Sequence, residues 1–292
     1  MMGALINLKK IFNKEFRCVA ALNARWNFYK IKKIFDGGKK CENDIFYVVS
    51  LTSYPRRYKD LARTIKSILM QKTRNKYEVI LWIAKNDIDE LPNDVVNLCK
   101  FGLKMNSCED LRSYKKIVPL AEIIAAGDIC PVGVIIADDD MNYPQGWLNS
   151  LIEDNVLYPA DVVAHRVHRI KYLSNGFPDD YMNWIHSISE SGIDSGNFAT
   201  GCGGVLYPTV LLKRMNFNIN VIRDTCPDGD DIWLYAETRK LNSVVRLATK
   251  KIDIFEWSAA QSSALWLENC IQGRNNQQIK KYWEVCGGWN KR

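Results

Sequence analysis

Two kinds of hydrophobic pattern alternate along the chain. Short unbroken apolar runs are typical of buried strands, whereas apolar residues spaced three or four apart are typical of helices. The predicted strands cover residues 45–51, 77–84, 101–105 and 132–137. The predicted helices are one that Pro55 begins, one over 114–127 that Gly127 ends, and one over 144–154. Strands that alternate with helices predict an α/β fold, in which a mostly parallel sheet is flanked by helices.

Polar segments fall at one edge of this predicted sheet. Ligands of such sheets bind beyond the carboxyl ends of the strands. The loop "TSYPRR" (52–57) follows the first strand, and three aspartates, Asp138 to Asp140, follow the fourth. The later part of the chain is less regular, but it contains a glycine-rich turn, "TGCGGVLYP" (200–208), and a second acidic pair, Asp230 and Asp231.

The first 40 residues form a segment of different character. Apolar side chains recur there at helical spacing, and ten Lys or Arg stand against two acidic residues, which gives this arm a formal charge of +8. Since the whole chain carries +7, residues 41–292 are nearly neutral. Such an arm can lie on an anionic membrane surface or pack on the body or another subunit. We expect peripheral membrane contact and no nucleic-acid partner.

Composition predicts one large body with appendages. The chain has 292 residues, of which 47 % are hydrophobic. The central apolar runs are far shorter than the roughly 20 residues that span a bilayer, and the first residues lack the pattern of a signal peptide. We therefore expect a cytoplasmic protein, with an arm (1–40), a body (41–262, divided near residue 160 into a donor and an acceptor half) and a tail (263–292).

Cysteine usage agrees with this compartment. The nine cysteines are odd in number and none is spaced C-x-x-C, so neither a disulfide framework nor a structural zinc site is expected. We expect free thiols that are mostly buried.

Asp138 and Asp140 are candidate metal ligands. They flank one residue, so in an extended segment their side chains point to the same side. Paired carboxylates suit Mg²⁺ or Mn²⁺, which retain waters and bridge to substrate phosphates. A solvated acidic turn or a helix cap is the alternative. Basic residues near the same edge favour a diphosphate ligand: Arg56, Arg57, Lys115 and Lys116.

The motifs and their order along the chain resemble those of GT-A-fold glycosyltransferases, which have a Rossmann-like fold. The resemblance is to bacterial family-2-like sugar transferases in particular. The likeness covers about residues 45–240. It rests on Tyr54-Pro55-Arg56-Arg57, a helix that ends at Gln71, Asp110 before Tyr114-Lys115-Lys116, Asp138-Asp139-Asp140, the turn Thr200–Gly204, and Asp230-Asp231-Ile232-Trp233. The resemblance implies transfer of a sugar from a nucleotide-sugar donor, with UDP-sugars favoured, to a glycan or lipid-linked acceptor such as capsule, O-antigen or lipooligosaccharide.

Residue roles follow from the same resemblance. It implies donor contacts from Thr52, Tyr54, Arg57, Asp110, Lys116, Asp138 and Asp139. Asp138 and Asp140 would bind Mn²⁺ or Mg²⁺, and Gly203, Gly204 and Trp233 would contact the acceptor. In an inverting reaction a carboxylate takes the acceptor proton, and we expect Asp231, beside Asp230, to be this base. Both acids also suit a plain helix N-terminus.

Departures from the family pattern leave alternatives open. Many metal-dependent members supply a third ligand, often a histidine, from the C-terminal region, but no histidine follows His186. A retaining transferase would share the fold and the metal motif. A non-catalytic scaffold that binds sugars or membranes is the alternative outside enzymes. A nucleotidyltransferase is less favoured because "SLTSYPRRY" contains no glycine. A haloacid-type phosphohydrolase is less favoured because the first strand ends in Leu51-Thr52-Ser53, where such an enzyme needs a nucleophilic aspartate.

Overall fold

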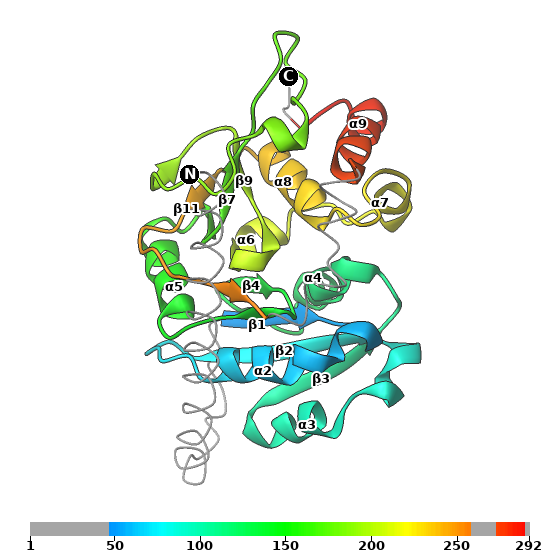
Figure 1. Cartoon of the computed structure of the whole chain (residues 1–292), viewed down its shortest axis with the longest axis vertical. Helices are drawn as coiled ribbons and strands as arrows, with labels where there is room; N and C mark the ends of the chain where they lie inside the picture. The colour runs from blue at the N-terminus through cyan, green and yellow to red at the C-terminus, as the bar shows by residue number, and fades with distance from the viewer. Residues whose placement is uncertain (1–46, 258–272, 290–292) are drawn as a thin grey trace, which may run out of the picture.

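An eight-stranded sheet forms the centre of the protein in the computed structural model, which describes residues 47–257 and 273–289 (Figure 1). The expected arm therefore lies wholly outside the described residues, as do both ends of the body (41–46 and 258–262) and two parts of the tail (263–272 and 290–292). In spatial order the strands are β3 (Leu103–Cys108), β2 (Tyr77–Ala84), β1 (Tyr47–Thr52), β4 (Gly133–Ala137), β10 (Val205–Pro208), β6 (Val162–Ala164), β11 (Val245–Leu247) and β8 (Gly192–Ile193).

The sheet is mixed, and only β10 and β8 run against the other strands. β3, β2, β1 and β4 pair in parallel, β10 pairs antiparallel with β4 and β6, and β8 pairs antiparallel with β11. The predicted α/β class, with a mostly parallel sheet flanked by helices, is confirmed by this topology. Two small sheets join it: β5 (Met141–Asn142) with β12 (Phe255–Glu256), and β7 (Val167–Arg169) with β9 (Asn197–Ala199).

Two apolar cores cover the two faces, because side chains alternate along each strand. In β4, Ile135 and Ala137 join one core, whereas Val134 and Ile136 join the other. The first core includes side chains of α2 (Tyr58–Leu69), α3 (Asn93–Val96) and α5 (Trp147–Leu157). The second includes side chains of α4 (Val118–Ala126), α6 (Thr209–Leu212), α7 (Ile219–Thr225), α8 (Asp230–Lys240) and α9 (Arg274–Cys286). The last three lie close together in Figure 1.

Predicted and observed boundaries differ where proline or glycine intervenes. The segment that Pro55 begins starts as a 3₁₀ turn, Pro55–Arg57, before α2. The predicted helix over 114–127 is two elements, a 3₁₀ helix (Arg112–Lys116) and α4, because Ile117 leaves helical geometry and Pro119 has no amide hydrogen to donate. Gly127 ends α4 as expected, with a left-handed φ of 87°.

Cysteine burial corrects one expectation. The six cysteines in the described part of the chain are free, as expected, but only Cys226 is buried. Among the described residues, no helix combines the length and apolar character needed to cross a bilayer.

Candidate active site

The carboxyl ends of β1 and β4 lie side by side. The register pairs Leu51 with Ala137, so the loop after β1 and the three aspartates after β4 emerge next to each other. Thr64 in α2 donates its hydroxyl to the carbonyl oxygen of Asp139 at 2.9 Å, and Tyr143 accepts the amide of Asp138 at 2.8 Å. The aspartate segment is therefore held by a helix and by its own turn.

Arg57 holds two of the three aspartates. Its Nη1 lies 2.9 Å from Oδ1 of Asp139, and its Nη2 lies 2.7 Å from Oδ2 of Asp140. Ser53 donates its hydroxyl to the other oxygen of Asp139 at 2.5 Å. The 3₁₀ turn that Pro55 begins brings Arg57 back over the end of β4.

Lys116 joins the third aspartate to the second acidic pair. Its Nζ lies 2.7 Å from Oδ1 of Asp138 and 2.9 Å from Oδ2 of Asp230, and its side chain is only 5 % exposed. Ser50 donates its hydroxyl to the carbonyl oxygen of Lys116 at 2.6 Å, which fixes this residue against β1. One ammonium group thus bridges residues that are 92 positions apart in the chain.

Gly201 lies where these groups meet. Its amide donates to Oδ1 of Asp231 at 3.0 Å. A Cβ atom at this position would lie 3.0 Å from Nζ of Lys116 and 3.2 Å from Oδ1 of Asp138. A residue with a Cβ atom would push Lys116 or Asp138 aside by a few tenths of an ångström, so glycine lets the backbone of this turn lie against the acidic cluster, which comprises Asp138–Asp140, Asp230 and Asp231.

Burial alters the acid strength of these carboxyl groups. It raises the pKa of Asp140 to about 7, and the charge of Asp139 adds to this effect against the opposing pull of Arg57. Burial and the neighbouring charge of Asp230 raise the pKa of Asp231 well above its usual range, although Lys116 opposes them. A carboxylate with a raised pKa is a stronger proton acceptor, which suits a general base.

One oxygen each of Asp138 and Asp140 is left for a divalent cation. The other oxygen of each accepts from Lys116 or Arg57. Residues 47–257 and 273–289 contain no group of three or more His, Cys, Asp or Glu side chains that could hold a metal. A cation held by these two carboxylates would complete its shell with water and substrate phosphate.

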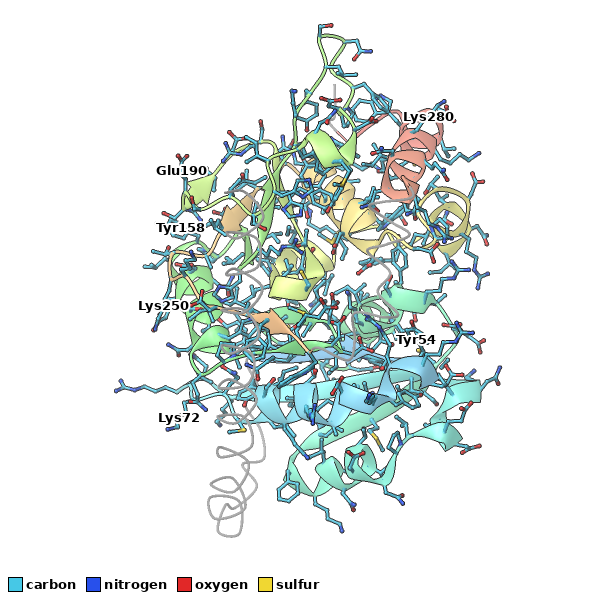
Figure 2. All side chains as sticks on the ribbon, in the orientation of Figure 1. Tyr54, Lys72, Tyr158, Glu190, Lys250 and Lys280 are labelled. Carbon is cyan, nitrogen blue, oxygen red and sulfur yellow. The ribbon has the colours of Figure 1, made fainter. Side chains whose placement is uncertain are left out.

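Three predicted donor residues lie at the margin of this cluster. Asp110 is 62 % exposed and pairs with Lys115 at 2.7 Å, rather than with Lys116. Thr52 donates its hydroxyl to the carbonyl oxygen of Trp82 at 2.8 Å, so this group serves the sheet. Tyr54 precedes the 3₁₀ turn at the sheet edge, where Figure 2 labels it.

The predicted acceptor residues are packed inside the protein. Trp233 is 2 % exposed and donates its indole N–H to the carbonyl oxygen of Asn216. Cβ atoms at Gly203 and Gly204 would lie 2.7 Å from Arg166 and 2.5 Å from Trp147, respectively. Close packing against Arg166 and Trp147 explains why residues 203 and 204 are glycines. Trp233 is too deeply buried to touch an acceptor. We therefore leave all three residues out of the proposed acceptor site.

Sequence reasoning missed the groups that hold the loop before α8. Asp228 is buried and forms ion pairs with Arg112 and Arg274, while Gln278 accepts the amide of Asp228 at 3.0 Å. Arg112 has a left-handed φ of 52°, a strained geometry for a residue with a side chain. These residues come from three distant segments, and the only signal in the sequence was the first aspartate of "PDGDD" (227–231).

Comparisons with known proteins give little beyond this geometry. The chain matches no protein-family model and no curated protein sequence. A structural neighbour is the crystal structure of S. aureus TarS in complex with UDP, which is 15 % identical in sequence with a TM-score of 0.45. The similar region covers 71 % of this chain and 59 % of that chain, which is less than two thirds of its length. So distant a likeness gives no information on ligand or reaction, and function is inferred below from the site itself.

Proposed function

We propose that the protein is a glycosyltransferase that moves a sugar from a nucleotide-sugar donor to a glycan or lipid-linked acceptor. One observation supports this function above the others: acidic groups from β4 and from α8 converge on the buried ammonium of Lys116 at the carboxyl edge of the sheet. Ligands of open α/β sheets bind at this edge. In this proposal the donor would bind beside Asp138, and Asp231 would be the basic carboxylate that meets the acceptor.

Each charged group has a task in this reaction. Asp138 and Asp140 would hold Mg²⁺ or Mn²⁺ through their remaining oxygens. A bound divalent cation would neutralise the charge that develops on a diphosphate leaving group. Arg57 keeps Asp139 and Asp140 in place, and Lys116 keeps Asp138 beside the second acidic pair. Asp231, with its raised pKa, would take the proton of the attacking acceptor hydroxyl, which gives inversion at the sugar carbon.

The first test is metal-dependent release of nucleotide from a panel of UDP-, GDP- and CMP-sugars. We expect one donor to be hydrolysed slowly in Mn²⁺ or Mg²⁺, and the double variant Asp138→Asn/Asp140→Asn to lose both this release and metal-dependent nucleotide binding. Asp128→Asn is the matched control, because Asp128 is exposed and lies after α4, away from the cluster. If neither release nor nucleotide binding responds to metal in the unaltered protein, the transferase proposal fails and the scaffold takes its place.

The base assignment has a separate test. With an acceptor in hand, Asp231→Asn should lower the rate of transfer by roughly 10²–10⁴-fold, which is the usual contribution of a general base. Nucleotide binding should persist, since Asp231 does not hold the metal. NMR of the product anomer checks the stereochemistry: retention at the sugar carbon would remove the role of Asp231 as base.

A further inference from the structure

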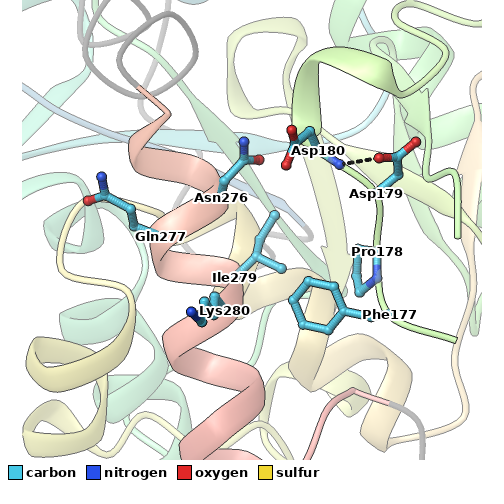
Figure 3. Close-up of a pocket in the computed structure, with 8 residues that line it drawn as sticks. All are labelled: Phe177, Pro178, Asp179, Asp180, Asn276, Gln277, Ile279 and Lys280. Carbon is cyan, nitrogen blue, oxygen red and sulfur yellow. Dashed lines mark hydrogen bonds between the residues drawn. The ribbon is translucent and has the colours of Figure 1, made fainter. Parts of the chain in front are cut away.

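A second cavity lies away from the acidic cluster, between the segment 177–180 and α9 (Figure 3). Its volume is about 210 Å³, below the roughly 300–1,000 Å³ of pockets that hold drug-sized ligands. Such a volume suits a single ring with its substituents, not a whole nucleotide. The polar and aromatic lining residues are Phe177, Asp179, Asp180, Asn276, Gln277 and Lys280, and Pro178 and Ile279 complete the lining.

Hydrogen bonds within the protein preform the walls of this cavity. The amide of Tyr181 donates to Oδ1 of Asn276 at 2.7 Å, which ties α9 to the opposite wall. Trp184 donates its indole N–H to the carbonyl oxygen of Asp179 at 2.8 Å. The ring of Phe177 packs edge-on against Trp283, with 5.1 Å between centroids. A preformed cavity loses little conformational entropy when it takes a ligand.

The lining combines one aromatic ring with both donors and acceptors. Asp179 and Asp180 offer carboxylate oxygens, and Lys280 offers an ammonium group. Hydrogen bonds from Asn183 and from the amide of Asp180 hold the pKa of Asp179 below its usual range, so this carboxyl group remains an acceptor. Gln277 adds both a donor and an acceptor. Carboxylates together with a lysine do not favour a simple anion, whereas hydroxyl groups, which donate and accept, match the set.

The same helix connects this cavity to the acidic cluster. Gln278, between two lining residues, accepts the amide of Asp228 at 3.0 Å, two positions before Asp230. Lys280, two positions further on, lines the cavity and is labelled on α9 in Figure 2. One face of α9 therefore contacts the loop before the proposed base, and another face lines the cavity.

We propose that the cavity between residues 177–180 and α9 binds a single neutral sugar ring, as a remote subsite for the acceptor. As an acceptor subsite it rests on the proposed function, but sugar binding itself does not require transfer. The ring of Phe177 would lie against the apolar face of the sugar, and the amide, carboxylate and ammonium groups would bind its hydroxyls.

Saturation-transfer difference NMR on the full chain tests this subsite. The probes are the methyl glycosides of glucose, galactose, rhamnose and N-acetylglucosamine, each without nucleotide or metal. We expect at least one to give a saturation signal that falls at least fivefold in both Phe177→Ala and Gln277→Ala. Gln277 is exposed, so its variant keeps the test valid if loss of the Phe177 ring disturbs folding.

Neighbouring lysines on α9 provide a matched control. Lys280 lines the cavity, whereas Lys281 pairs with Asp224 at 3.6 Å on another face. Lys280→Ala should weaken sugar binding and Lys281→Ala should not. No saturation signal from any probe, or a signal that all three cavity variants retain, would overturn the subsite. Failure of the proposed function is distinct from this result, since it appears as no metal-dependent release of nucleotide.

Discussion

Lys116 provides the buried positive charge at the centre of the candidate active site. Three carboxyl groups surround its buried ammonium, and two of them form ion pairs with it at under 3 Å. A buried ion pair adds little net stability when complete, but removal of one partner leaves an unpaired buried charge, which is costly. This residue is therefore the shared counter-ion of Asp138 and Asp230.

Substitution of this lysine should destabilise the fold. We expect Lys116→Met to lower the free energy of unfolding by about 3–5 kcal/mol, because Asp138 and Asp230 lose their shared counter-ion. Lys115→Met is the control: Lys115 is also buried, but its partner Asp110 is 62 % exposed and can return to water, so the cost should be under about 1 kcal/mol. Urea denaturation measures the free energy of unfolding of both variants. Equal decreases in the two variants would contradict the role of Lys116 as a buried counter-ion.

At the scale of elements, α8 and α9 place the second acidic pair. Asp230 and Asp231 lie in the first turn of α8, where the helix dipole favours negative charge. Asp228, in the preceding loop, forms one ion pair with Arg112 of the 3₁₀ helix Arg112–Lys116 and another with Arg274 of α9. A single buried carboxylate thus joins three segments that approach the site from different parts of the chain.

Loss of this carboxylate should loosen α9. In Asp228→Ala we expect backbone amides of Arg274–Cys286 to exchange with deuterium at least tenfold faster, because the helix loses its ion pair with the loop before α8. Asp224→Ala is the matched variant, since Asp224 also pairs with α9, through Lys281, but is 56 % exposed. Its exchange should stay near that of the unaltered protein. Hydrogen exchange followed by mass spectrometry measures the rates of α9 in both variants. Similar rates in the two variants would show that Asp228 does not hold α9 in place.

The whole molecule buries titratable groups in its second core as well as at the site. His168 is 1 % exposed and stacks near His186 and Tyr181. Its Nδ1 accepts the amide of Ser187 at 2.9 Å, which requires that nitrogen to be unprotonated. Burial, and then the charge of Arg166 and the neighbouring His186, lower the pKa of His168 to about 3.

This buried imidazole predicts loss of stability in mild acid. Because the folded pKa lies below the unfolded value of about 6.5, the unfolded chain binds the proton first. The contribution is complete above about pH 6.5 and is lost progressively as pH falls toward the folded value. Between about pH 6.5 and pH 5 the unaltered protein should lose about 2 kcal/mol more than His168→Gln. Urea denaturation at each pH gives this difference, and parallel curves for the two proteins would refute it.

Local sequence pattern determined most of the strands and helices between residues 45 and 160. β2 was predicted to the residue, and the short apolar runs at β1 and β4 were found because a buried strand needs apolar side chains on both faces. The same pattern located the aspartates at the sheet edge, whereas the acids at the start of α8 were singled out by the family resemblance. The bounds of β3, β4 and α5 differ from the predicted ones by one to three residues, and the segments that begin at Pro55 and Arg112 open in 3₁₀ geometry.

Only the tertiary structure decided which charges meet. Arg57 pairs with Asp139 and Asp140, Lys116 joins Asp138 to Asp230, and Lys115 turns outward to Asp110. The sequence places two lysines side by side and does not say which of them is buried among carboxylates. The sequence likewise did not indicate that Trp233 is buried. Hydrophobic periodicity indicates which face of a helix or strand is apolar, and it is a local property of the sequence. Contacts between residues that are about a hundred positions apart depend on how the elements pack against one another, which no local pattern specifies.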